Sequence, residues 1–247
     1  MKSKTTTSEK KEYWKNLRRK QKVQYVWDYY KFPIAVALIF FYIIGYTICG
    51  HFGEKDTLLY TGLINISAGE ELAGQLSDGF LDYSNKNPDK YDLQLYTGLY
   101  LTNNPNDPNH EYAASSRIKL LASIDGEQLD VVLMTKEVFD AFSQNGYLVN
   151  LEELLRASAP GDFAELKPYL VTNKVISEDN SEELLTDDSL SYHAVSSEYP
   201  MGLNVSQKGL FKQAGFEDDV FLGVIGNSPR TDMAVNYIRY LYSQTRP

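Results

Sequence analysis

The chain has 247 residues, of which 43% are hydrophobic and 13% aromatic, so it can bury a core and is not a disordered tail. Its 24 basic and 33 acidic residues give a net charge of −9, a poor match for phosphate backbones that argues against nucleic acid as a partner. The single cysteine, Cys49, excludes an internal disulfide framework and a cysteine-rich zinc site, and the three histidines form no metal-spaced pair.

Basic charge is concentrated at the start of the chain. Residues 1–32 hold ten basic and three acidic residues, a net charge of +7, and the remaining residues hold 14 basic and 30 acidic ones, a net charge of −16. Residues 32–53 contain no Asp, Glu, Lys or Arg. Because about 20 apolar residues of helix span the roughly 30 Å hydrocarbon core, we expect this stretch to form one transmembrane helix beginning at Pro33.

The distribution of charge also predicts an orientation for this helix. Lys and Arg are retained on the cytoplasmic side, so the basic arm of residues 1–31 should be cytoplasmic and residues 54–247 extracellular. We therefore expect a single-pass protein of the cell membrane, with the lipid bilayer as the partner of residues 32–53. A neighbouring membrane protein or transporter is a second candidate partner.

Three other interpretations of the first 53 residues remain open. A cleaved signal peptide would have an apolar region of only about 7–15 residues. Lipidation of Cys49 would require a small residue before it, where this chain has Ile48. The arm, with Tyr13 and Trp14 among its lysines, is of a kind that lies along an anionic leaflet, although a flank that only fixes topology explains the same residues.

Residues 54–247 alternate between strand-like and helix-like periods of apolar residues. Strands are expected over Thr57–Ile66, Asp92–Leu101, Leu129–Met134, Tyr147–Leu151, Tyr199–Val205 and Val220–Ile225. Helices are expected from Ser67 with Glu70 as a capping box, from Glu111, over Lys136–Asn145, and from Ser228 with Pro229 in the first turn. This alternation predicts an α/β domain with a mostly parallel sheet that is flanked by helices on both faces.

Two finer expectations concern one helix and one loop. In the helix from about Glu111, the spacing of Ala114, Ile118 and Leu121 predicts that these three side chains face the core. Residues 175–197 contain six acidic residues and no Lys or Arg, which predicts a solvated acidic loop or insertion.

Several stretches of residues 54–247 resemble the first lobe of the extracellular solute-binding proteins of ABC importers. The resemblance is carried by Phe80, Asn87 and Pro88 before the second strand, by Lys119–Val132 leading into the third, and by Gly146–Leu151. It implies a periplasmic-binding-protein-like single lobe. The family's usual second lobe has no counterpart here, since only about 48 residues separate Leu151 from the returning strand at Tyr199.

Ligands of open α/β sheets bind beyond the carboxyl ends of the strands, which selects the loops that could hold a small molecule. The candidate ligand-binding residues in these loops are Asn65, Ser67, Gly69, Thr102, Asn103, Thr135, Asn227 and Ser228. Helix caps and ordinary turns explain the same residue types equally well.

Catalytic motifs are missing from the sequence: there is no nucleophile elbow, zinc-protease motif, phosphate-binding loop or dinucleotide fingerprint. His193 lies near serines but beside no second motif. We therefore expect no enzyme, no cofactor and no metal. The leading hypothesis is a non-catalytic solute-binding-like domain that acts as a protein-interaction, sensory or accessory module. The alternative is a small-molecule binder with a reduced cleft serving an ABC importer.

Overall fold

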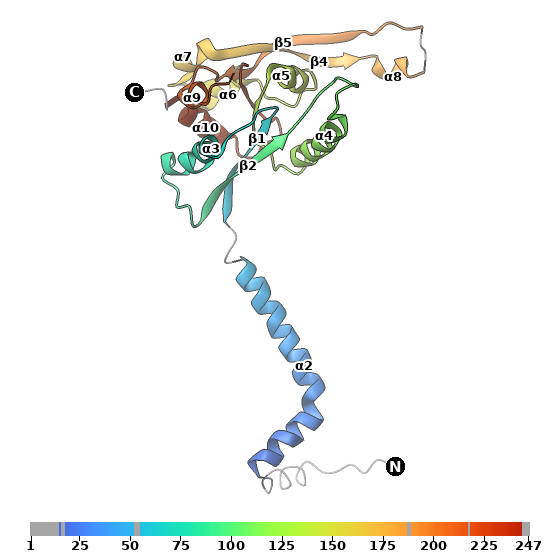
Figure 1. The fold of residues 1–247 in the computed structure, drawn as a ribbon, viewed down its shortest axis with the longest axis vertical. Helices are drawn as coiled ribbons and strands as arrows, with labels where there is room; N and C mark the ends of the chain where they lie inside the picture. Colours follow the sequence, from blue (N-terminus) through green and yellow to red (C-terminus); the bar gives the residue numbers. More distant parts are fainter. Residues whose placement is uncertain (1–14, 16–17, 52–54, 187–188, 217, 244–247) are drawn as a thin grey trace. The chain divides into compact units, whose positions relative to one another are not determined.

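The computed structural model describes residues 15, 18–51, 55–186, 189–216 and 218–243 (Figure 1). The chain divides into two compact units, residues 1–54 and 55–247. Each unit is described by itself below.

The first unit contains one long helix, α2 (Arg19–His51), with Pro33 inside it and not at its start. Among the residues that the structure describes, no helix is both long enough and apolar enough to cross a membrane. The predicted transmembrane helix over 32–53, and with it the single-pass location in the cell membrane, is therefore wrong. The first half of α2 carries Arg19, Lys20, Lys22, Asp28 and Lys31, so its 33 residues are not apolar throughout.

The second unit is built on one six-stranded sheet in the order β2-β1-β3-β6-β5-β4. Its strands are β1 (Asp56–Ile64), β2 (Tyr91–Leu99), β3 (Val131–Met134), β4 (Leu170–Asp179), β5 (Ala194–Asn204) and β6 (Phe221–Val224). β1 pairs in parallel with β2 and β3, whereas β6 is antiparallel to β3 and β5, and β4 is antiparallel to β5. The sheet is mixed, so the predicted mostly parallel sheet is wrong. β4 and β6 run opposite to β1, β2 and β3, whereas β5 runs with them, because each of the three later strands pairs antiparallel with its neighbours.

Helices cover both faces of this sheet. They are α3 (Glu70–Tyr83), α4 (His110–Asp125), α5 (Lys136–Gln144), α6 (Leu151–Ser158), α7 (Phe163–Leu166), the 3-10 turn η1 (Lys167–Tyr169), α8 (Ser181–Leu184), α9 (Gly209–Ala214) and α10 (Thr231–Ser243). One core cluster joins α3, α6, α9 and α10 to the sheet, and the other joins α4 and α5. β3 is buried along its whole length, as expected for a strand covered on both faces.

The face of α4 that packs on the sheet differs from the predicted one. Ala113, Ser116, Leu120 and Ile124 are buried, whereas Ile118 is 70% exposed and Leu121 37% exposed. A polar residue faces inward because the Ser116 hydroxyl accepts a hydrogen bond from the backbone N–H of Tyr100. The predicted inner stripe of α4 therefore lies on its outer side.

The acidic stretch over 175–197 is not an irregular loop. Its described residues form the outer part of a β4–β5 hairpin, with Asp179 opposite Ala194 and the short helix α8 near the tip (Figure 1). Conversely, Tyr147–Leu151 is not a strand, because only Leu148 makes an isolated bridge to Ile225. β4 was not predicted, because its acidic side chains did not give the apolar pattern of a strand. Strand formation depends on backbone pairing and tolerates polar side chains on exposed faces.

Candidate functional site

The parallel strands β1, β2 and β3 end at one edge of the sheet, and the loops that follow them build the candidate site. Asn65 follows β1 directly and has a left-handed backbone with φ 58°. Its side chain donates to the Leu101 carbonyl at 2.7 Å and accepts from the Leu101 backbone N–H at 2.7 Å. Asn tolerates this conformation better than most residues. Asn65 therefore fixes the loop after β2 and is not itself free to bind a ligand.

The loop after β2 is a series of tight turns. The hydroxyl of Thr102 accepts from the Asn104 N–H at 3.1 Å, and the Tyr100 hydroxyl donates to Asp107 at 2.7 Å. That hydrogen bond raises the pKa of Tyr100. The Asn109 N–H and then the Tyr100 hydroxyl lower the pKa of Asp107. These bonds place Asn103 at the edge of the sheet with its side chain facing α4.

A cavity of about 160 Å³ lies between α4 and α5 beside this loop. It is lined by Leu101, Thr102, Asn103, Arg117, Leu120, Leu121, Ile124, Glu137, Val138, Ala141, Phe142, Asn145 and Tyr147. The rings of Phe142 and Tyr147 meet edge to face with centroids 5.5 Å apart. Most of the lining is apolar, and the two charged lining residues, Arg117 and Glu137, both contact Asn103.

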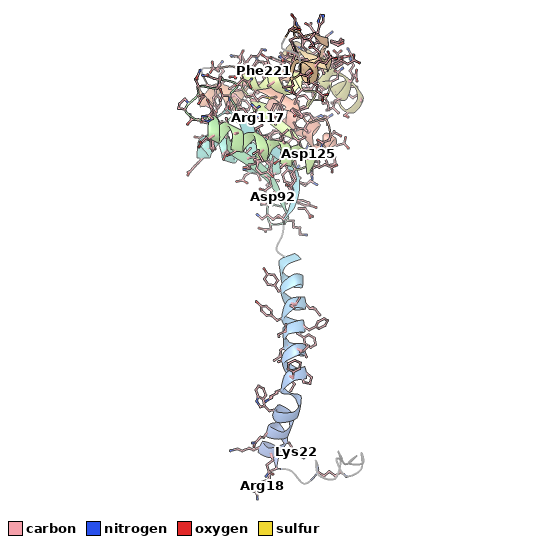
Figure 2. All side chains as sticks on the ribbon, turned by 90° about the vertical axis from the view of Figure 1, so that its right-hand side faces the viewer. Arg18, Lys22, Asp92, Arg117, Asp125 and Phe221 are labelled. Atoms are coloured by element: carbon pink, nitrogen blue, oxygen red, sulfur yellow. The ribbon has the colours of Figure 1, made fainter. Side chains whose placement is uncertain are left out.

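Three polar residues from three elements meet at the mouth of the cavity. Arg117 Nη2 donates to Asn103 Oδ1 at 3.5 Å, and the Asn103 backbone N–H donates to Glu137 Oε1 at 3.4 Å. Arg117, which is labelled in Figure 2, comes from the middle of α4, and Glu137 from the first turn of α5. Asn103 thus lies between a cation and an anion.

A second, more open hollow of about 450 Å³ begins at the same residues. It shares Thr102, Asn103 and Arg117 with the first cavity and continues past Ala114 and Ile118 on the outer side of α4. The two hollows adjoin at these three residues and are together called the Asn103 depression.

The remaining predicted site residues do not reach this depression. Ser67 and Gly69 line a separate hollow of about 250 Å³ between α3 and α9. The N-cap of α3 is Gly69 without a side-chain hydrogen bond, so the capping box predicted from Ser67 is wrong. Thr135 is the N-cap of α5, again without a side-chain bond, and lines neither of the hollows at the Asn103 loop.

Asn227 and Ser228 lie at the opposite edge of the sheet. β6 is antiparallel to β3, with Val224 beside Val131, so the residues after β6 return to where the parallel strands begin. Asn227 Nδ2 donates to the Ile124 carbonyl at 2.7 Å, and the Ser228 hydroxyl donates to Asp130 at 2.6 Å. α10 begins at Thr231, so Ser228 is not its cap. Both residues make hydrogen bonds within the fold, and the structure does not bring them together with the other predicted site residues.

The two charged residues of the cavity, Arg117 and Glu137, were not among the predicted site residues. Their positions depend on the rotation of α4, and the sequence pattern favoured the wrong face of that helix. The only indication in the sequence was that Arg117 and Glu137 carry opposite charges and lie on the helices that follow the second and third predicted strands.

Clusters of three or more His, Cys, Asp or Glu side chains that could hold a metal ion are absent from the part of the chain that the structure describes. Comparisons with protein-family models, curated proteins and solved structures found no match to this chain. The candidate site therefore rests on the geometry of these residues alone.

Proposed function

We propose that residues 55–247 form a non-catalytic sensory or accessory domain that binds a small, mostly apolar molecule in the cavity between α4 and α5. The observation that carries this proposal is the cavity itself, about 160 Å³ of largely apolar space at the carboxyl ends of β2 and β3. Strand ends of this kind are the usual place for ligands in α/β sheets. The resemblance to solute-binding lobes stays a prediction.

The size and lining of the cavity restrict what it can take. A cavity of about 150 Å³ lined by apolar side chains holds a benzene ring. The present cavity of about 160 Å³ therefore suits one ring or one branched aliphatic group, and it is below the roughly 300 Å³ at which drug-sized sites begin. Sugars fit poorly, because their hydroxyl groups would lose water without gaining enough polar partners.

Binding without catalysis is the simplest use of this site. Among the lining residues only Arg117 and Glu137 are charged, and they come from different helices. The lining hydroxyl of Thr102 already accepts a turn hydrogen bond. No base among the lining residues contacts a nucleophile, which covalent catalysis would need.

Titration of the full-length protein with benzyl alcohol tests the proposal, since this probe has one ring and one uncharged polar group. We expect saturable heat in calorimetry and slower hydrogen exchange in α4 and α5. Ala141→Leu fills the cavity from α5 and should weaken binding at least tenfold, whereas Ala122→Leu, on the exposed side of α4, should leave it unchanged. Absence of binding, or binding unaffected by Ala141→Leu, would overturn the proposal.

A further inference from the structure

Two opposite charges line the α4–α5 cavity, and only weak contacts tie them to the fold. Arg117 and Glu137 each contact Asn103 only through long hydrogen bonds of 3.5 and 3.4 Å. Such distances are at the outer limit for hydrogen bonds, so these contacts cost little to break. Within the described ranges, neither residue takes part in an ion pair.

Three other charged residues of these helices have partners of their own. On α5, Lys136 pairs with Asp140 one turn away. On α4, the Lys119 ammonium lies over the ring of Tyr96, 5.2 Å from its centroid. Arg117 and Glu137 differ from these three residues, because both line a hollow and neither has an ion-pair or ring partner in the described part of the chain.

We propose that the ligand of this cavity is a free apolar α-amino acid, a class that the proposed function leaves open and on which this inference rests. The apolar side chain would enter the cavity, the α-carboxylate would bind the Arg117 guanidinium, and the α-ammonium would bind the Glu137 carboxylate. Charge-assisted hydrogen bonds of both kinds are stronger than neutral ones, and guanidinium matches carboxylate geometry.

Electrostatics favours a zwitterion over a ligand with a single charge. An apolar acid would be attracted by Arg117 but repelled by Glu137. An apolar amine would be attracted by Glu137 but repelled by Arg117. Residues 55–247 carry 14 basic and 29 acidic residues, so their net charge of −15 also disfavours a free anion. A zwitterion satisfies both charges and has no net charge. A residue within a peptide has neither an α-ammonium nor an α-carboxylate. The site should therefore bind a free amino acid more tightly than a polypeptide.

Calorimetry on the full-length protein with four probes that share one phenyl ring tests this inference. L-Phenylalanine has both charges, 3-phenylpropanoate only the carboxylate, 2-phenylethylamine only the ammonium, and N-acetyl-phenylalanine amide neither. We expect each lost charge to weaken binding by roughly tenfold or more.

Variants assign each charge to its residue. Arg117→Met should bring the Kd of L-phenylalanine to that of the amine, and Glu137→Gln should bring it to that of the acid. Lys119→Met and Glu111→Gln, on the same helix but outside the cavity lining, should leave both Kd values unchanged.

The outcomes distinguish this inference from the proposed function. If all four probes and benzyl alcohol bind alike, the head group is not recognised and the amino-acid inference is overturned, while the apolar cavity remains a binding site. If the peptide-like amide binds best, the ligand is a polypeptide and the inference also fails. If neither the four probes nor benzyl alcohol binds, both proposals are overturned together.

Discussion

The guanidinium of Arg230 lies 3.1 Å from Oδ1 of Asp130, a carboxylate that has no solvent exposure. Asp130 also accepts from the Tyr60 backbone N–H at 2.8 Å and from the Ser228 hydroxyl at 2.6 Å. Arg230 lies over the ring of Tyr60 at 4.7 Å from its centroid. This network ties β1, the start of β3 and the approach to α10 together, at the sheet edge opposite the candidate site.

Arg230→Met should destabilise the protein by about 3 kcal/mol, because it leaves a buried carboxylate without its counter-charge. Arg239→Met is the matched control, since Arg239 pairs with Asp162 at 2.7 Å but both side chains are at least 40% exposed. That control should cost less than about 1 kcal/mol. Urea unfolding measures both, and equal losses would show that the burial of Asp130 does not matter.

Gly79 of α3 and Tyr240 of α10 make a second contact that can be tested. A Cβ added at Gly79 would collide with the Tyr240 hydroxyl, whereas the nearest ring carbon is 3.4 Å away. Gly79→Ala should therefore cost about 1–3 kcal/mol through overpacking. Tyr240→Phe alone should cost about 1 kcal/mol, because its hydroxyl donates to the Gln75 carbonyl at 2.6 Å.

The double variant should be more stable than the sum of the two single losses predicts, since Phe removes the atom with which the new methyl group collides. Gly74→Ala is the control in the same helix. Nothing lies within 4 Å of a Cβ at Gly74, so this change should be neutral or stabilise by about 0.5–1 kcal/mol. Strict additivity in denaturant unfolding would contradict the predicted collision.

Alkaline pH should weaken the fold through the buried tyrosines of α10. Burial, with a contribution from the Asp82 charge, raises the pKa of Tyr240 to about 12. Burial also raises the pKa of Tyr237 and of Tyr242. Because the folded state keeps protons that the unfolded chain loses above about pH 10, this stability is complete below pH 10 and is lost as the pH rises through about 12.

Urea midpoints at about pH 8 and about pH 11 measure this loss. Tyr240→Phe should reduce the difference between the two midpoints, because it removes one of the ionising groups. Tyr112→Phe, at an exposed position, should leave the difference unchanged. If the urea midpoint at the higher pH is no lower than the midpoint at the lower pH, the prediction is refuted.

Asn65 should matter for binding although it does not touch the cavity. Asn65→Ala and Asn65→Gly both remove the two hydrogen bonds to Leu101, but only Ala also strains the left-handed backbone, by roughly 1–2 kcal/mol. We expect Ala to be the less stable of the two, and both variants to bind benzyl alcohol more weakly because the cavity wall at Leu101 loosens. Unchanged affinity in both would show that the loop is held by other contacts.

Local patterns in the sequence predicted much of the fold but less of the site. The buried strand that ends at Met134 and the helix over Lys136–Asn145, which the structure has as α5, were correctly predicted. The inner face of α4 was not, because Ser116 packs inward through a hydrogen bond that depends on tertiary structure. Likewise the direction of β6 is set by its antiparallel pairing with β3 and β5, which is a tertiary contact, so the place of Ser228 could not be predicted from local pattern.

The place of β6 in the sheet determines when the domain can finish folding. It joins the β2-β1-β3 half to the β5-β4 half, yet it is the last strand in the chain. A ribosome makes both halves before it makes the strand that links them, so the nascent chain exposes the unpaired edges of β3 and β5 until residues 221–224 have left the exit tunnel. This domain is therefore expected to complete its folding only after β6 has been synthesised, and the open edges of β3 and β5 are a risk of aggregation until then.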